Sequence, residues 1–174
     1  YVYDQKHLVP FGEYFPFSNI INKTFLSNYF NLDSLSKGEN KYFPPSIIPL
    51  ICYEGIFTNI VGNNRKLGAK LLVNITNDAW FGKNTGPLQH FTHVKYRAIE
   101  EGLPLARSSN MGFSGLINPL GKIIYQVEKE RNSYIDVKIP IEVGTFYSQY
   151  RFKIVYFLLV FLYLFGYFIL FLYY

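Results

Sequence analysis

Cys52 is the one cysteine in the sequence and the first candidate for chemistry. It ends an apolar run, residues 47–52, and the chain must turn at the following Tyr53-Glu54-Gly55. A thiol at a strand end is open to substrate, and backbone N–H groups of the turn can bind an oxyanion. A lone cysteine on an apolar strand can equally be an inert core residue. The first interpretation predicts nucleophilic acyl chemistry, and the second predicts none.

Two charged side chains could assist such a nucleophile. Glu13 lies on the Gly-containing loop HLVPFGEY, where a carboxylate could act as an acid or base or orient a cation. Lys6 could give positive charge to a tetrahedral oxyanion and to a thiolate. As isolated residues, both are equally consistent with solvated surface positions. Their value as candidates therefore depends on their neighbours.

The segment NDAWFG, residues 77–82, follows a second apolar run at residues 70–75. Loops after strands carry functional sites in open α/β sheets. Asn77, Trp80 and Phe81 could therefore form one wall of a substrate site, or they could serve ordinary packing.

His90 and His93 stand three apart on a predicted helix and so share one of its faces. That spacing could suit a metal ion, but no cysteine or carboxylate pattern supplies a third ligand. We expect packing or capping roles for the two histidines, and we expect no metal and no organic cofactor.

The elements that must position these residues form an α/β pattern. Strands are predicted at residues 1–10, 47–52, 70–75, 103–107, 112–117, 122–127 and 133–139, with helices at 59–67 and 86–101. Residues 11–45 are irregular with one short helix near 20–28, and residues 118–121 form a turn. Strand–helix–strand–helix followed by hairpins predicts a sandwich with a mixed sheet.

Residues 154–174 contain no charged side chain and are apolar on every face. A helix of that length is about 30 Å long, the hydrocarbon thickness of a bilayer. We expect a transmembrane helix over residues 151–174. Arg151 and Lys153 precede it, and by the positive-inside rule they favour a cytoplasmic domain. The net charge is +5 without a dense Lys/Arg run, so no nucleic-acid partner is expected.

Together the motifs resemble one family. HLVPFGEY, ICYEG, NITNDAWFG, GPLQHF, RAIEEGLPLARSSNMG and NPLG occur in an order and spacing similar to the nitrilase-like domain of the apolipoprotein N-acyltransferases, members of the carbon-nitrogen hydrolase superfamily. The resemblance implies an α-β-β-α sandwich over residues 1–150, with its N-terminal part missing, followed by the C-terminal transmembrane helix. The absence of a starting Met and of a signal-peptide pattern agrees with a chain that begins inside a domain.

The resemblance also implies roles for single residues. Cys52 matches the nucleophile, and Glu13 matches a supporting glutamate. Tyr53 and Glu54 match the pair after the nucleophile and are expected to contact substrate, as is Trp80, which matches a tryptophan beside the site. The lysine of the family stands at the position of Gln5, and the role passes here to the adjacent Lys6. Neighbours on a strand point to opposite faces, so Lys6 reaches the site only if the strand has ended or bulged there. The family's general-base glutamate would lie upstream of Tyr1.

The reaction implied is transfer of an acyl chain from a phospholipid, through a cysteine thioester, to the α-amino group of a lipoprotein's N-terminal diacylglyceryl-cysteine. The implied partners are phospholipid and lipoprotein. The implied location is the outer, periplasmic face of the bacterial inner membrane, which is opposite to the side that the positive-inside rule favours. Two alternatives stay open. One is a nitrilase-type amidase, and the other is a degenerate, membrane-bound lipoprotein-binding relative.

Overall fold

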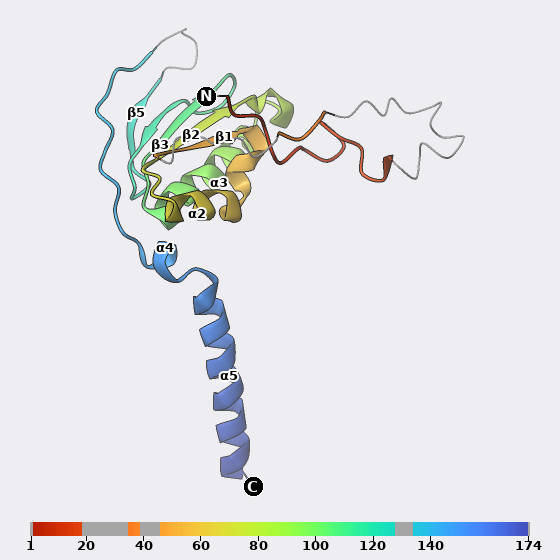
Figure 1. Cartoon of the computed structure of the whole chain (residues 1–174), viewed down its shortest axis with the longest axis vertical. Coiled ribbons are helices and arrows are strands. Elements are labelled where there is room, and N and C mark those ends of the chain that lie inside the picture. Colours follow the sequence, from red (N-terminus) through yellow and green to blue (C-terminus); the bar gives the residue numbers. More distant parts are fainter. Residues whose placement is uncertain (1, 19–34, 39–45, 128–133, 174) are drawn as a thin grey trace.

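A five-stranded sheet, in the order β1-β2-β3-β4-β5, forms the centre of the domain (Figure 1). The computed structural model describes residues 2–18, 35–38, 46–127 and 134–173. β1 (Ile47–Ile51), β2 (Leu71–Thr76) and β3 (Leu105–Ser109) are parallel. β4 (Gly115–Ile117) and β5 (Ile123–Gln126) continue the sheet in antiparallel fashion. The predicted mixed sheet is confirmed.

Two crossover connections lie on one face of this sheet (Figure 1). Parallel neighbours need such connections because the chain must return to the starting edge. The first holds η2 (Cys52–Ile56) and α2 (Thr58–Lys66), and the second holds η3 (Asp78–Phe81) and α3 (Thr85–Glu101). The core between helices and sheet is built mainly from Ile48, Leu50, Val61, Leu72, Phe91, Val94, Ala98, Leu103, Leu105 and Ile117. One helix layer and one sheet layer of the expected sandwich lie within the described residues.

Most elements begin and end close to their predicted positions. Pro49 lies in β1, which is an edge strand of the described sheet, where a missing backbone donor is tolerated. The turn at residues 118–121 is also confirmed: the Asn118 side chain accepts hydrogen bonds from the backbone N–H of Leu120 and Lys122, at 3.0 and 2.8 Å. Gly121 has φ 80°, a left-handed conformation that glycine adopts without strain.

Two strand predictions are wrong for the described residues. Residues 2–9 form no strand, because the backbone N–H groups of Lys6, His7 and Val9 donate to the carboxylates of Glu54 and Glu13 instead of a neighbouring strand. Residues 134–139 are also outside any strand. Their alternating pattern defines two faces, but a strand needs an adjacent backbone as well, and the described sheet ends at β5. The helix predicted near residues 20–28 lies outside the described residues.

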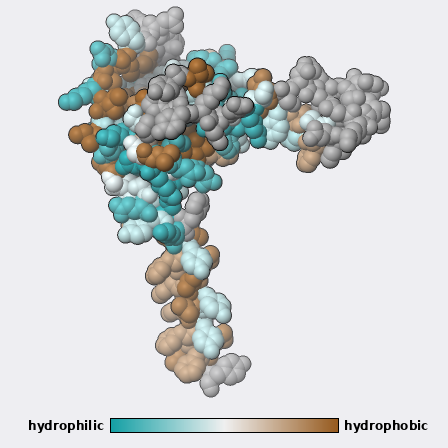
Figure 2. Space-filling view, viewed as in Figure 1, coloured by the Kyte–Doolittle hydropathy of each residue, from teal (hydrophilic) through white to brown (hydrophobic). Residues whose placement is uncertain are grey.

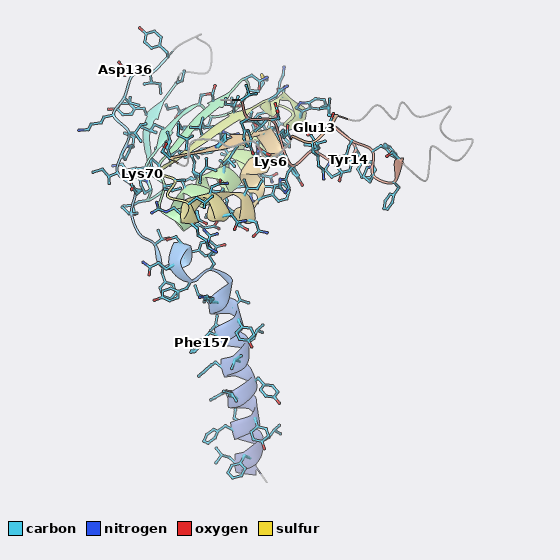
Figure 3. The ribbon with its side chains drawn as sticks, in the orientation of Figure 1. Lys6, Glu13, Tyr14, Lys70, Asp136 and Phe157 are labelled. Atoms are coloured by element: carbon cyan, nitrogen blue, oxygen red, sulfur yellow. The ribbon has the colours of Figure 1, made fainter. Side chains whose placement is uncertain are left out.

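The C-terminal helix α5 (Phe152–Tyr173) extends away from the domain (Figure 1). Residues Lys153–Leu172 are long and apolar enough to cross a membrane, and none of this stretch is buried inside the protein. Its surface is largely tan to brown in Figure 2, with paler patches along it. Phe157, labelled in Figure 3, is 70% exposed.

An ion pair joins this tail to the domain. Arg151 stands between α4 (Phe146–Tyr150) and α5, and its guanidinium donates to the buried Glu101 carboxylate at 2.6 Å. Gly62 of α2 makes room for it, because a Cβ there would lie 1.3 Å from Arg151 Nη1. The Thr145 hydroxyl also donates to the carbonyl of Glu100. These contacts attach the start of α5 to the end of α3.

Candidate active site

The turn after β1 presents Cys52 in a strained backbone conformation. Cys52 has φ 47°, in the left-handed region that costs a residue with a Cβ about 1–2 kcal/mol. The turn is held at both ends. Ile51 donates its N–H to Glu54 Oε2 at 2.9 Å, and a Cβ at Gly55 would lie 2.5 Å from Val94, so only glycine lets η2 approach α3 this closely.

This strain predicts a stability difference between two variants that lack the thiol. The free energy of unfolding of Cys52→Gly should be about 1 kcal/mol higher than that of Cys52→Ala, because glycine adopts this φ at no steric cost. Cys52→Gly is therefore expected to be the more stable variant. Chemical denaturation of the two variants in the same detergent measures the difference. If Cys52→Gly were the less stable of the two, the backbone at Cys52 would not be held under strain.

Cys52 opens into a pocket of about 430 Å³. Four segments that are distant in the sequence meet there: the N-terminal segment, the end of β1, the end of β2 with its following loop, and the loop after β3. The lining residues are Gln5, Glu13, Ile51, Cys52, Ile75, Thr76, Asn77, Trp80 and Asn110. The structure therefore brings the predicted Cys52, Glu13, Asn77 and Trp80 together.

Gln5, not Lys6, faces the pocket beside Glu13. The Gln5 amide nitrogen donates to Glu13 Oε2 at 2.8 Å, and the backbone N–H of Val9 donates to the same oxygen at 2.7 Å. Lys6 is not a lining residue, and its Nζ lies 5.3 Å from the ring centre of Tyr3. Figure 3 shows Lys6 and Glu13 on the segment that passes the domain near η2. The structure thus separates Lys6 from the other predicted catalytic residues.

Glu54 is fully buried and does not line the pocket. Its carboxylate accepts hydrogen bonds from the backbone N–H groups of Lys6 (2.7 Å), His7 (3.2 Å) and Ile51 (2.9 Å), and from the Tyr3 hydroxyl (3.0 Å). Burial and the adjacent carboxylate raise the pKa of Tyr3 far above its usual value, so this hydroxyl stays a donor. Glu54 therefore connects the N-terminal segment to the turn at Cys52.

The other predicted substrate contacts divide between the pocket and its surroundings. Tyr53 packs edge-on against Phe57, with ring centres 5.1 Å apart, and is not a lining residue. Trp80 lines the pocket and is 75% exposed, whereas Phe81 packs on the His90 ring at 4.9 Å. Asn77 and Asn110 both line the pocket, and the Asn110 amide nitrogen donates a hydrogen bond to Asn77 Oδ1 at 2.6 Å.

A buried polar network behind Cys52 was missed by the sequence prediction. Asp78 accepts hydrogen bonds from Arg107 Nη2 at 2.7 Å and from Ser109 Oγ at 2.6 Å, and its Oδ1 lies 2.7 Å from His90 Nδ1. Burial alone would raise the pKa of Asp78, but the bonds from His90 and Ser109 and the charge of Arg107 hold it well below its usual range.

The network continues to the backbone on either side of Ile51, at Leu50 and Cys52. Arg107 also donates to Asn74 Oδ1, and the Asn74 amide donates to the carbonyl of Leu50 at 2.9 Å. His90 Nε2 lies 3.2 Å from the carbonyl oxygen of Cys52. The available signal was the occurrence of Asp78, His90 and Arg107 within three of the motifs that mark the resemblance.

A strained cysteine at a strand end and a glutamate on a neighbouring loop line one pocket, and the sequence comparison shows the family to which this domain belongs. Residues 2–148 match the family model described as carbon-nitrogen hydrolase, and the chain belongs to this family. It is 40% identical to the apolipoprotein N-acyltransferase of Rickettsia prowazekii (strain Madrid E), over 85% of this chain and 31% of the relative. It is 39% identical to that of Rhodopseudomonas palustris (strain ATCC BAA-98 / CGA009), over 85% of this chain and 29% of the relative.

The chain thus spans less than a third of the length of these curated relatives. Similar solved structures include the NitN amidase of Nesterenkonia sp. AN1, with a TM-score of 0.48 and 19% identity over 71% of this chain and 51% of that one. Another is Nit3 of Saccharomyces cerevisiae, a member of branch 10 of the nitrilase superfamily, with a TM-score of 0.47 and 23% identity over 55% of this chain and 40% of that one.

Proposed function

We propose that this protein transfers an acyl chain from a phospholipid to the α-amino group of the N-terminal diacylglyceryl-cysteine of a lipoprotein, with Cys52 as the nucleophile. The observation that carries the proposal is the pocket in which Cys52, Glu13 and the exposed Trp80 meet. Two further facts support it. Relatives that match 85% of the chain are apolipoprotein N-acyltransferases, and the domain is followed by a helix able to cross a membrane.

The chemistry proceeds in two balanced steps. The Cys52 thiolate attacks the ester carbonyl carbon of the phospholipid, the S–C bond forms, the ester C–O bond breaks, and the lysophospholipid oxygen takes up a proton. The lipoprotein amine then attacks the thioester carbon, the N–C bond forms, the S–C bond breaks, and the amine loses one proton. In both steps a tetrahedral oxyanion is stabilised by hydrogen-bond donors near Cys52. Glu13 supports these steps by orienting Gln5, which donates to it.

Both substrates of this reaction carry lipid tails. A site held at a membrane surface by α5 meets such tails where they leave the bilayer. We therefore place the domain on the periplasmic face of the bacterial inner membrane, where lipoproteins are presented, with phospholipid and lipoprotein as its partners.

Trp80→Ala should lower kcat/KM for the phospholipid donor by about tenfold with little effect on the free energy of unfolding. Trp80 is 75% exposed, so truncation leaves no core cavity and removes apolar contact area at the pocket mouth. The matched control is Leu120→Ala, an equally exposed apolar residue in the turn between β4 and β5. The role proposed for Trp80 is wrong if both variants transfer acyl chains at the wild-type rate.

Gln5→Lys should raise kcat/KM by about tenfold, because an ammonium group at this lining position stabilises an oxyanion more than a neutral amide does. Lys6→Ala is the control and should leave transfer close to wild type, since Lys6 lies outside the pocket. Steady-state rates of both variants, compared at equal amounts of membrane-inserted protein, test this. A large loss of acyl-transfer activity in Lys6→Ala would instead show that Lys6 performs the role of the family's lysine.

A second candidate function has one observation in its favour. The pocket carries the polar side chains of Gln5, Glu13, Asn77 and Asn110, which could hydrogen-bond a small amide. A nitrilase-type amidase would resolve the thioester with water instead of an amine. Ammonia release from small amides, without acyl transfer to a lipopeptide, would favour that alternative.

The degenerate, lipoprotein-binding alternative rests on Gln5 itself. None of the lining residues, all of which lie in the described part of the chain, is a lysine or an arginine. Binding of a diacylated lipopeptide without any acyl transfer would favour this alternative.

A further inference from the structure

His90 is buried behind the nucleophile, with only 4% of its surface exposed, and each ring nitrogen has a close polar neighbour. Nδ1 lies 2.7 Å from Asp78 Oδ1, and Nε2 lies 3.2 Å from the carbonyl oxygen of Cys52. Phe81 covers the ring, with centroids 4.9 Å apart. The ring therefore bridges the buried carboxylate and the backbone of the proposed nucleophile.

Both neighbours of this ring are hydrogen-bond acceptors. The carbonyl of Cys52 has no proton to donate, and Asp78 is ionised, since it receives hydrogen bonds from Thr76, Arg107 and Ser109. A neutral imidazole has one N–H group, so in either tautomer a ring lone pair would face an oxygen lone pair. Only a ring that is protonated on both nitrogens satisfies both contacts.

A charged His90 changes the electrostatics beneath the turn. His90 and Arg107 then carry two positive charges against the one negative charge of Asp78, and both bond to that carboxylate. Arg107 Nη2 and His90 Nδ1 lie 3.4 Å apart because they bond to the two oxygens of the same carboxylate.

We infer that His90 is a doubly protonated positioning residue that fixes the carbonyl group of Cys52, and thereby the orientation of the backbone at the nucleophile. This inference rests on the proposed role of Cys52. A charge-assisted hydrogen bond to the carbonyl offsets the strain of φ 47° at this residue. Because a trans peptide is planar, holding the carbonyl toward His90 directs the Tyr53 N–H to the opposite side, away from the buried network. His90 thus orients a backbone donor that an oxyanion on Cys52 can use.

Two substitutions separate the two contacts of the ring. In His90→Asn the amide nitrogen can take the place of Nδ1 and donate to Asp78, but no side chain then donates to the Cys52 carbonyl. In His90→Gln the amide nitrogen can take the place of Nε2 and donate to that carbonyl, but the bond to Asp78 is lost. His93→Asn is the matched control, because His93 is exposed and lies on the same helix.

The first readout is the rate at which iodoacetamide alkylates the full chain in detergent micelles, which reports on Cys52 alone because it is the one cysteine. We expect His90→Asn to slow alkylation by at least about tenfold, while His90→Gln and His93→Asn stay within about threefold of wild type. A residue with a purely structural role would instead slow both His90 variants in proportion to their loss of stability. That proportional result would overturn the inference.

The second readout is a ¹H–¹⁵N correlation spectrum of the histidine rings at neutral pH. The chain has three histidines, so the His90 signals are those that disappear in His90→Asn. We expect protons on both ring nitrogens of His90, and a ring with one proton would overturn the inference. Neither readout needs a lipid substrate. If both gave the expected result while no acyl transfer occurred, the proposed function would fail and the role of His90 would stand.

Discussion

Cys52→Ala is expected to lower the rate of acyl transfer by about 10⁴-fold or more, to the level of background aminolysis. No other described side chain at the pocket has a thiol, since Cys52 is the one cysteine of the chain. Alanine keeps the Cβ and therefore keeps the backbone strain at φ 47°. The substitution removes the sulfur and changes little else. The measurement is transfer of a labelled acyl chain from phospholipid vesicles to a diacylated lipopeptide.

The control for this variant is its stability. Cys52 is only partly buried, so removing its sulfur leaves no enclosed cavity in the core. The denaturation midpoint of Cys52→Ala should therefore stay near that of the wild type. A folded Cys52→Ala protein that transfers acyl chains at the normal rate would contradict the assignment of Cys52.

Glu54→Ala is expected to lower the free energy of unfolding by at least about 3 kcal/mol, because removal of a fully buried carboxylate leaves buried backbone N–H groups without this acceptor. Four donors lose their hydrogen bond to Glu54: the hydroxyl of Tyr3 and the backbone N–H groups of Lys6, His7 and Ile51. The N-terminal segment then loses its attachment to the turn at Cys52, and Gln5 and Glu13 leave the pocket with it. Activity should fall together with stability.

Glu142→Ala is the matched control for this second variant. Glu142 makes a surface ion pair with Lys70 at 3.8 Å, and such pairs contribute about 0–1 kcal/mol. Denaturation curves of the two variants should therefore differ clearly. A Glu54→Ala protein as stable as Glu142→Ala but inactive would show that Glu54 contacts substrate, as the sequence predicts.

The sheet and its crossovers could be predicted because local patterns determine them. The apolar runs at β1 and β2 and the helical spacing in α3 are properties of neighbouring residues. The turn at Asn118 is equally local, since its own side chain caps it. Residues 2–9 were predicted as a strand from the same kind of pattern. Their backbone donors bind carboxylates that lie elsewhere in the sequence, and an alternating pattern carries no information about such partners.

In the candidate site, too, the features set by local sequence could be predicted and those set by contacts between distant residues could not. Cys52 could be found from its place at a strand end, and Glu13 and Trp80 from motifs. The distinction between Gln5 and Lys6 depends on which neighbour faces the pocket, and this follows from the bonds that Glu54 and Glu13 make to the segment. Asp78, His90 and Arg107 are single polar residues on three different elements. Only the fold shows that they meet behind Cys52.

The most direct test of Cys52 as the nucleophile is the intact mass of the full-length protein after incubation with phospholipid, wild type beside Cys52→Ala. We expect an added acyl mass on the wild type, sensitive to hydroxylamine as a thioester is, and none on the variant. A folded, membrane-inserted wild type without any adduct, or an equal adduct on both proteins, would contradict it.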